Sequence, residues 1–469
     1  MKNGFILTLV IMLGILFSAC EESPAAKYAD PRAENLRAAI QSAQNLLENS
    51  VSGSGEGEFL AADGEALNEA IEIAETFINR DLSSETQSRI DNVTDALYQA
   101  CCVFESRVNS GLNDLIDTRA TRETRYLYDN LKRMAPEYLL FGMHDATGYG
   151  VGWSSDDVRS DVKDVCGDYP AVFSWDAHTI INGSNNDIER LAFRILYTHN
   201  LGGITTICWH QNDPENKSFY HDRVGYDPVP MMLPGGQHHE NYRKKLQKIA
   251  RFFQHLCGEK GESVPVIFRP YHEQNGSWFW WGKGHRTGAE YVDLWRFTVR
   301  YLRDSLGVHN FIYAFSPDGN QYDSKAQYLI DYPGDDYVDI FGVDFYFAYG
   351  NYDELYKFRN RLIHIAEYAE ERVKLAALTE AGDRKGWNTS ELLIENWFTS
   401  CLLGPIVIHQ TAKKVAYAAV WRNASESHHF APYPGHPSVT DFIGFYTDER
   451  TFFLNDLPDV FQYMTPLPK

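Results

Sequence analysis

Short apolar runs alternate with amphipathic helical patterns from about residue 118 to the end of the chain. Eight runs, rich in Val, Ile and aromatic residues, span 139–143, 171–175, 204–209, 264–268, 311–315, 338–345, 375–379 and 415–421. Helical patterns lie between them at 187–197, 241–256, 289–305, 352–368 and 391–401. Strands that alternate with helices pair in parallel through right-handed crossovers. The pattern therefore predicts an α/β fold, a closed (β/α)8 TIM barrel over residues 118–469.

A purely helical pattern precedes the barrel, within residues 21–117. Apolar residues recur there at steps of three and four, which places each set on one helix face. The sets are Leu36, Ile40, Ala43 and Leu47; Leu67, Ile71, Ala74 and Ile78; and Ile90, Val93, Leu97, Cys101 and Phe104. They predict an all-α three-helix bundle with a first loop at 52–57. We interpret this module as a spacer; a sugar-binding accessory module is the alternative, although the stripes are aliphatic and contain no Trp.

The first 20 residues have the pattern of a secretory signal. An apolar run over residues 5–17 follows the basic Lys2 and is too short to span a membrane. Small residues then precede Cys20, which resembles a bacterial lipoprotein signal whose Cys is lipidated. We therefore expect export and lipid anchoring through Cys20 to the outer membrane, at its periplasmic face or at the cell surface. Ordinary cleavage that leaves a free secreted protein is the alternative.

The charge balance narrows the class of partner. The chain has 43 Lys and Arg against 64 Asp and Glu, a formal net charge of −21. Nucleic acid and anionic membrane surfaces bind basic patches, so neither is expected, and a neutral substrate fits better. The seven cysteines show no Cys-x-x-Cys spacing, which argues against zinc or thioredoxin-like chemistry. We expect a monomer that needs no cofactor and no metal.

Polar or aromatic side chains follow each of the eight apolar runs. They are His144 and Asp145; Asp176; His210; His272 and Glu273; Ser316 and Asp318; Asp344 and Tyr346; Glu380; and Trp421 and Arg422. In a β/α barrel the carboxyl ends of the strands converge on the active site. Polar groups used only for packing would each carry a desolvation cost, so their regular placement indicates a functional face.

Two carboxylates at these strand ends indicate acid-assisted chemistry. Glu273 lies in the aromatic-rich segment 269–282, and a carboxyl held against rings stays protonated near neutral pH, ready to donate. Glu380 follows the seventh run. Hydrolysis of a glycosidic bond uses such a pair, about 5 to 5.5 Å apart for retention of configuration and about 6.5 to 9.5 Å for inversion. Flat rings beside a carboxylate also suit the apolar face of a sugar. An aromatic loop that only packs, with Glu273 in a surface ion pair, is the alternative.

The segments 269–282, 344–346, 378–382 and 421–422 together resemble glycoside hydrolase family 26, over roughly residues 118 to 465. The commonest activity of that family is endo-β-1,4-mannanase. The resemblance implies a retaining barrel enzyme acting on mannan, galactomannan or glucomannan, with Glu273 as acid/base and Glu380 as nucleophile. It also implies Tyr346 as the tyrosine that orients the nucleophile, and substrate contacts at His210, His272, Trp278, Trp421, Arg422 and His144. Gln274-Asn275 differs from the Asn-Thr that the resemblance implies at these positions, which puts the substrate contacts on the leaving-group side in question.

Other functions remain open at this point. A related xylanase or mixed-linkage β-glucanase differs only in loop contacts. A non-catalytic surface glycan-binding protein is a different class, against which the retention of both carboxylates argues. A metal-dependent hydrolase on the same barrel usually has two histidines separated by one residue after the first strand, whereas only His144 is present. Residues 428–435 either line one end of the cleft or form a solvent-exposed turn.

Overall fold

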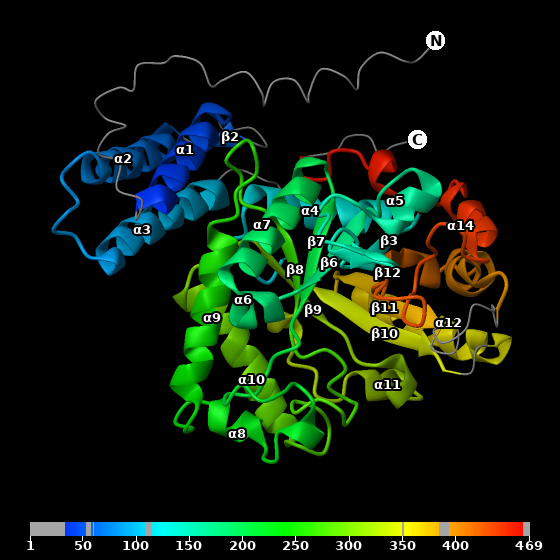
Figure 1. The fold of residues 1–469 in the computed structure, drawn as a ribbon. Coiled ribbons are helices and arrows are strands. Elements are labelled where there is room, and N and C mark those ends of the chain that lie inside the picture. Colours follow the sequence, from blue (N-terminus) through cyan, green and yellow to red (C-terminus); the bar gives the residue numbers. More distant parts are fainter. Residues whose placement is uncertain are drawn as a thin grey trace, which may run out of the picture.

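The computed structural model describes residues 33–52, 58–59, 61–107, 115–348, 351–383 and 394–462 (Figure 1). Cys20 with the whole predicted signal, and nearly all of the predicted loop 52–57, lie outside these residues. Across the described part of the chain, no helix is both long and apolar enough to cross a membrane.

Eight parallel strands form the predicted closed barrel at the centre of Figure 1. They are β3 (Leu139–His144), β6 (Val172–Asp176), β7 (Ile204–Cys208), β8 (Val266–Arg269), β9 (Phe311–Phe315), β10 (Ile340–Phe347), β11 (Leu375–Asp383) and β12 (Val415–Val420). Each pairs with its neighbour in that order, and β12 returns to pair with β3, with Tyr417 opposite Leu140. A short strand, β13 (Thr451–Phe452), pairs in parallel with the first two residues of β3. Two more short strands, β4 (Tyr149–Gly150) and β5 (Trp153–Ser154), form a small antiparallel hairpin.

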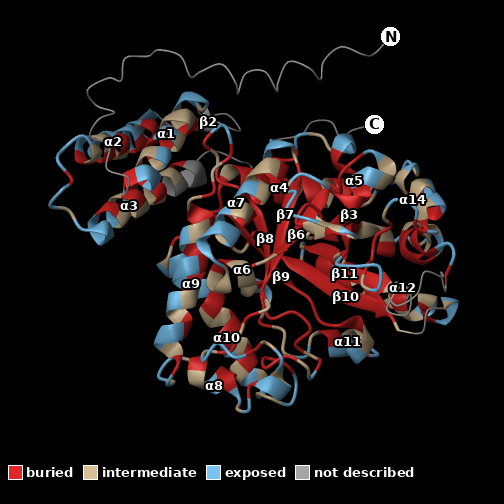
Figure 2. Ribbon diagram, in the orientation of Figure 1, coloured by how far each residue is buried: buried red, intermediate tan, exposed pale blue. Residues whose placement is uncertain are grey.

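Alternate residues along each strand face two different cores. In β3, Leu139, Phe141 and Met143 pack outward against the surrounding helices, whereas Leu140 belongs to the core inside the barrel. The inner core is closed at the amino-terminal end of the strands by α4 (Arg122–Met134), which contributes Leu131. Since both faces of every strand are covered, the strands are mostly apolar, with polar residues mainly toward their carboxyl ends, and Figure 2 shows them as the most buried part of the fold.

Helices surround the barrel. The longer ones are α7 (Asn185–Asn200), α9 (His239–Gln254), α10 (Gly288–Arg300), α12 (Leu355–Glu371) and α14 (Val439–Tyr446). The shorter ones are α5 (Asp161–Cys166), α6 (His178–Asn182), α8 (Pro228–Met232), α11 (Lys325–Tyr328) and α13 (Gly404–Val407). Single 3-10 turns lie at His221–Arg223, Gly319–Gln321, Asp335–Tyr337, Tyr352–Glu354, Ala412–Lys414 and Leu454–Asp456. Two of the long helices begin at reciprocal capping boxes, Ser184 with Asp187 for α7 and Thr287 with Glu290 for α10.

One helix prediction needs correction. The pattern at 391–401 predicted an α-helix, but residues 391–393 lie outside the described chain and Trp397–Leu403 form a π-helical turn. In that turn the backbone of Phe398 donates a hydrogen bond to the buried Asp441 of α14, at 2.7 Å. Asp441 thus caps the first turn of this segment, where backbone N–H groups have no partner within the helix. A second π-helical turn, Tyr301–Ser305, extends α10.

Three helices precede the barrel and share a core of their own: α1 (Glu34–Glu48), α2 (Ala61–Ile78) and α3 (Gln87–Arg107). Two short parallel strands, β1 (Val51–Ser52) and β2 (Glu58–Phe59), flank the first connection. The predicted stripes are shifted at their ends, because Leu46 and Phe77 are buried where Leu47 and Ile78 were expected. A helix turns 100° per residue, so a stripe drifts around it and a neighbouring position takes over at the last turn.

This helical group lies against one side of the barrel, beside α7 and α9 (Figure 1). Gln99 of α3 donates to the Leu306 carbonyl at 3.2 Å, and Asp91 pairs with Arg251 at 3.4 Å. Gly261 has a φ of +83°, and a Cβ built on it would lie 2.1 Å from the Ser42 carbonyl oxygen of α1. Glycine is therefore required at this close approach of two backbones.

Candidate active site

All the predicted site residues within the described chain lie at the carboxyl ends of the barrel strands. They are His144 at the end of β3; His210 after β7; His272, Glu273 and Trp278 after β8; Tyr346 in β10; Glu380 in β11; and Trp421 and Arg422 after β12. Carboxylate oxygens of Glu273, Asp344 and Glu380 all lie within 4.8 Å of one another. The two predicted carboxylates, far apart in sequence, thus meet at a separation below the inverting range of about 6.5 to 9.5 Å.

The backbone of the segment after β8 is held in an unusual conformation that points Glu273 into this group. Tyr271 and Glu273 have φ values of +52° and +54°, which are uncommon for residues with side chains. The Glu273 amide donates to the Ser316 carbonyl at 2.9 Å, and Trp278 Nε1–H donates to Glu273 Oε2 at 2.8 Å. A Cβ on Gly276 would lie 2.2 Å from the Trp278 ring, so glycine allows the indole to reach the carboxylate.

Both oxygens of Glu380 accept hydrogen bonds from buried side chains. The Tyr346 hydroxyl donates to Oε2 at 2.8 Å, and a guanidinium nitrogen of Arg269 donates to Oε1. Glu380 stands opposite Asp344 in the β10–β11 pairing, where the register shifts by one residue after Val343. That irregularity brings the two carboxylates side by side on adjacent strands. Glu380 is therefore oriented from two directions.

Arg269 connects the buried carboxylates. It ends β8, is only 1% exposed, and donates to Asp344 Oδ2 at 2.7 Å and to Ser316 Oγ at 3.1 Å as well as to Glu380. Thr379 Oγ1 donates to the other Asp344 oxygen at 2.6 Å. Burial raises the pKa of Asp344 well above its usual range, and Arg269 opposes that rise. Burial alone would lower the pKa of Arg269, but Asp344 and Glu380 raise it, so the guanidinium stays charged.

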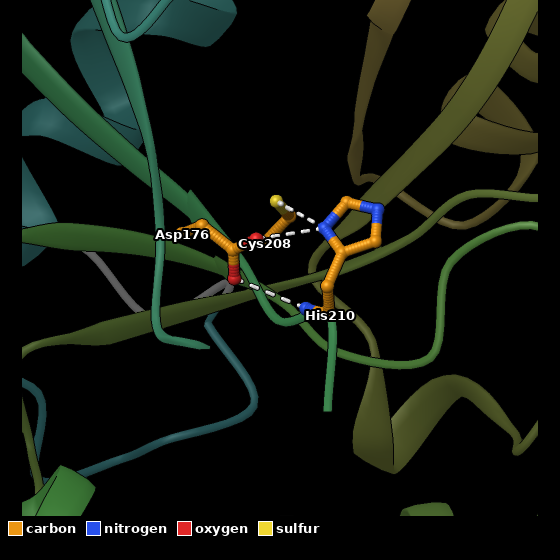
Figure 3. A group of neighbouring side chains, drawn as sticks. All are labelled: Asp176, Cys208 and His210. Atoms are coloured by element: carbon orange, nitrogen blue, oxygen red, sulfur yellow. Dashed lines mark hydrogen bonds and ion pairs between the residues drawn. The ribbon is translucent and has the colours of Figure 1, made fainter. Parts of the chain in front are cut away.

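A row of two histidines and one aspartate lies beside Glu273. His210 Nδ1 is 2.8 Å from Asp176 Oδ2, as Figure 3 shows. On the other side of the ring, His210 Nε2 is 3.2 Å from His272 Nε2. Burial lowers the pKa of His272 well below its usual value, so this imidazole is neutral. Burial alone would raise the pKa of Asp176, but the charge of His210, its hydrogen bond and the backbone N–H of His178 lower it, so this carboxylate is ionised.

Trp421 lies close to the same histidines. Its ring stacks on the His144 imidazole with centroids 4.0 Å apart and planes 23° apart, and it lies 5.7 Å from the His210 ring. His144 Nδ1 is 2.9 Å from Ser174 Oγ, which fixes the ring, and burial lowers the His144 pKa. An aromatic platform held in this way offers a flat surface to a sugar ring.

Arg422 belongs to a smaller polar cluster at the ends of β12 and β3. Its guanidinium donates to the Tyr149 hydroxyl at 2.8 Å, and that hydroxyl donates to Asp145 Oδ2 at 2.6 Å. Burial raises the pKa of Tyr149, so its hydroxyl keeps the proton that the second bond needs. The cluster holds the Arg422 guanidinium at the same face of the barrel as Trp421, its neighbour in the chain.

The loop at 428–435 combines both alternatives that the sequence left open. Phe430 and Ala431 are buried, and their backbone N–H groups donate to Asn423 Oδ1 at 2.8 and 3.0 Å. The Phe430 ring meets the Tyr346 ring edge to face at 5.7 Å, whereas residues 434–435 are exposed. The first part of the loop therefore supports the wall behind Tyr346, and its tip is a surface turn.

Metal-binding side chains gather in three groups among the residues that the structure describes: Asp176, Cys208 and His210; His221, Asp227 and His285; and Glu273, Asp344 and Glu380. In the third group the Arg269 guanidinium already donates to two of the carboxylates. In the first, the Asp176 oxygens are taken up by hydrogen bonds from His210 and from two backbone N–H groups. Neither donor set therefore presents the free oxygens that a cation would need.

Sequence reasoning did not assign a role to Arg269, Asp344 or Asp176. Asp176 and Asp344 carried a visible signal as polar residues at strand ends, but their partners are 34 and 75 residues away in the chain. Arg269 follows an apolar run, and a charged residue at such a position can simply mark the end of a strand. Only the packed barrel shows that it lies between two carboxylates.

A closed β/α barrel with two close carboxylates at its carboxyl-terminal face, one of them oriented by a tyrosine, has the architecture of a retaining glycoside hydrolase. The family model for glycosyl hydrolase family 26 matches residues 116–397, more than half of the sequence. The chain belongs to glycosyl hydrolase family 26.

Relatives of the chain agree with this assignment. It is 34% identical over 335 residues to a mannan endo-1,4-β-mannosidase of Bifidobacterium adolescentis, covering 68% of this chain and 33% of that protein. A Cellulomonas fimi endo-β-1,4-mannanase structure matches with a TM-score of 0.71 and 36% identity, over 75% of this chain and 80% of that one. The catalytic domain of a Bacillus sp. JAMB-750 endo-β-1,4-mannanase matches with a TM-score of 0.70 and 34% identity, over 75% of this chain and 96% of that one. The chain thus spans about a third of the length of the B. adolescentis relative.

Proposed function

We propose that the protein is a retaining endo-β-1,4-mannanase with Glu380 as nucleophile and Glu273 as acid/base. One observation carries this proposal. One oxygen of each carboxylate lies within 4.8 Å of the other, below the separation of about 6.5 to 9.5 Å between the carboxyl groups of inverting enzymes. The hydrogen bonds of the two carboxylates differ. Glu380 accepts from Arg269 and Tyr346, whereas Glu273 accepts from the Trp278 indole N–H.

In the first step Glu380 attacks the anomeric carbon of the sugar as a carboxylate. The bond from that carbon to the leaving oxygen breaks, and the Glu273 carboxyl transfers its proton to this oxygen. The product is a glycosyl ester of Glu380, with Glu273 now ionised. Tyr346 keeps its hydrogen bond to the second carboxylate oxygen, so Glu380 presents one defined oxygen to the sugar.

In the second step Glu273 accepts a proton from a water molecule whose oxygen attacks the anomeric carbon. The ester bond to Glu380 breaks, and Glu273 is protonated again for the next cycle. Two inversions at one carbon retain its configuration. Arg269 stays charged throughout and compensates the Glu380 charge when the ester is cleaved.

Substrate contacts follow from the same face of the barrel. Trp421, stacked on His144, offers a platform under the sugar at the cleavage point, and Trp278 borders the leaving-group side next to Glu273. His210, His272 and Arg422 offer polar contacts to hydroxyl groups. The assignment to mannan, galactomannan or glucomannan is supported by the B. adolescentis and C. fimi relatives, both described as mannanases.

The test is product release from linear β-1,4-mannan, xylan and mixed-linkage β-glucan, with Glu380→Gln as the inactive control. Mannooligosaccharides with retained anomeric configuration, followed by NMR, are expected from the parent alone. A 2-deoxy-2-fluoro mannosyl substrate should leave a covalent adduct on Glu380 that mass spectrometry locates. Products released only from another glycan would change the assigned substrate. No products from any of the three glycans would favour a glycan-binding protein.

We also propose that the chain is exported and lipid-anchored through Cys20, with the helices α1–α3 as a spacer and with no partner subunit. The support is the signal-like sequence before Cys20 and the aliphatic core of the three helices. Metabolic labelling with a radioactive fatty acid should mark the parent and not a Cys20→Ala variant. Labelling of both would place the anchor elsewhere, and labelling of neither would favour the free secreted form.

A further inference from the structure

We propose that His221, Asp227 and His285 form a binding site for Zn²⁺, which joins the loop after β7 to the loop after β8. One ligand atom from each of these three side chains lies within 4.8 Å of the other two. Imidazole nitrogen and carboxylate oxygen are ligands that zinc accepts, whereas Mg²⁺ and Ca²⁺ prefer oxygen alone. The site uses neither carboxylate of the proposed mechanism, so it can be tested without any substrate.

Backbone contacts hold the two loops that carry these side chains next to each other. The backbone N–H of His221 donates to the Trp278 carbonyl at 2.9 Å. The preceding residue, Tyr220, forms an antiparallel bridge with Phe279. With the loops fixed in this way, the His221 and His285 rings stack with their centroids 3.3 Å apart and their planes 11° apart. Two potential ligands from different loops are thus brought together.

A backbone carbonyl orients the His285 ring. His285 Nε2 lies 2.7 Å from the Ser277 carbonyl oxygen. A carbonyl oxygen only accepts, so Nε2 carries the proton of this hydrogen bond and Nδ1 is the nitrogen left to bind a cation. Histidines that bind metal ions generally donate from their second ring nitrogen to a carbonyl, a carboxylate or a water in this way.

His221 and Asp227 are already close enough to share one ion. His221 Nε2 is 3.1 Å from Asp227 Oδ1, near the spacing of about 3.4 Å between two ligand atoms of a tetrahedral zinc ion. Asp227 precedes α8, but its side chain makes no capping hydrogen bond to that helix. Its side chain is 57% exposed, so a cation can reach the carboxylate from solvent. A zinc ion would take the place of the proton between the imidazole and the carboxylate.

Zinc binding requires the two rings to leave their stacked arrangement. An imidazole binds a cation through a lone pair in the plane of the ring, so two parallel rings cannot both point at one ion. Both rings have room to tilt, because the His221 side chain is 24% exposed and His285 is half-buried. Three protein ligands leave the fourth position of a tetrahedral ion to water.

The first measurement is calorimetric titration of the tag-free full chain with ZnCl2 at pH 7.5, after treatment with a chelator. We expect the strongest site to bind one Zn²⁺ per chain. His221→Gln and His285→Gln should each weaken that site by about 100-fold, because each removes a ligand. No zinc uptake by the parent, or equal affinity in the parent and both variants, would overturn the proposal.

Two control variants should bind zinc as the parent does. Cys208→Ala removes one member of the group formed by Asp176, Cys208 and His210. His255→Gln removes a histidine at the end of α9 that contacts the Arg251 carbonyl. Loss of zinc binding in Cys208→Ala would place the ion in the other group, and loss in His255→Gln would place it at α9. Either result would contradict the proposed site.

X-ray absorption of the zinc-loaded parent tests the ligands without any variant having to fold. The spectrum should show nitrogen and oxygen at about 2.0 to 2.2 Å, with the scattering pattern of two imidazoles. A sulfur atom at about 2.3 Å, or a single imidazole, would refute the proposed ligands.

Hydrogen exchange tests whether the ion joins the two loops. Zinc should slow amide exchange in peptides that cover residues 218–227 and 277–285 of the parent, and it should not do so in His285→Gln. Slowing in only one of the two loops would contradict the bridging role. A parent that binds zinc in this way but releases no products from any glycan would refute the proposed function and leave the zinc site standing.

Discussion

Removal of the Arg269 charge tests the electrostatic design of the site most directly. Arg269 is 1% exposed and donates to Asp344 and Glu380, which face each other on adjacent strands. Arg269→Met keeps most of the side-chain volume and deletes the cation. Two carboxylates would then share a buried site with no compensating charge. Breaking a buried ion pair in this way costs about 3 to 5 kcal/mol of folding free energy.

The cost should depend on pH in a definite direction. Without the cation, the carboxyl pair binds a proton more tightly in the folded than in the unfolded protein, and each unit of such a pKa difference is worth about 1.4 kcal/mol. A folded-state pKa above the unfolded value contributes stability at low pH that is lost as pH rises. In urea unfolding, the free energy of unfolding that Arg269→Met loses relative to the parent should therefore be larger at pH 8 than at pH 5. The acid limb of kcat/KM should also move to higher pH, because the nucleophile must ionise.

Two further variants make this reasoning refutable. In Arg269→Met/Asp344→Asn only Glu380 remains of the two carboxylates that Arg269 contacts, so at pH 8 the double variant should recover about half of the lost stability. Arg361 serves as a control, because it is buried, donates to the backbone carbonyl oxygens of Gly319 and Tyr322, and pairs at 3.5 Å with Asp323, a carboxylate that is exposed. Arg361→Met should destabilise equally at both pH values. The same pH-independent loss in Arg269→Met, or a double variant less stable than the single one, would refute the argument.

Three other outcomes are expected. Tyr346→Phe removes the 2.8 Å bond to Glu380 and should lower kcat/KM on mannan by about 10- to 100-fold at an unchanged melting temperature; unaltered kinetics would contradict its orienting role. Burial lowers the pKa of His436 to about 4, so the folded protein favours the neutral imidazole. Stability therefore falls as the pH drops below the pKa that this residue has in the unfolded chain. Between pH 7.5 and pH 5, the free energy of unfolding measured in urea should therefore fall by about 2 kcal/mol more for the parent than for His436→Gln. The same pH dependence in both proteins would exclude this residue. In Gly261→Ala the new Cβ meets the Ser42 carbonyl, so α1–α3 should be cleaved faster by protease while activity on mannan persists; unchanged cleavage would refute a required glycine.

Much of the fold could be predicted because its signals are local. Eight apolar runs separated by helical patterns correspond to strands that are covered on both faces, and each run appears as a strand within a few residues of its expected position. Glu273 and Glu380 could be placed on one face because the carboxyl ends of barrel strands share that face. The errors occur at the π-helical turn Trp397–Leu403, which an apolar spacing does not separate from an α-helix, and where a helical stripe drifts, as at Leu46.

The amino-acid sequence by itself thus determined the barrel and the placing of Glu273 and Glu380 at the carboxyl ends of its strands. Only the tertiary structure decided their separation, the place of Arg269 between Asp344 and Glu380, and the row from Asp176 to His272. The physical reason is that hydrogen bonds and ion pairs depend on distances of a few ångströms. Barrel closure sets those distances among residues from different strands, and no spacing along the chain records them.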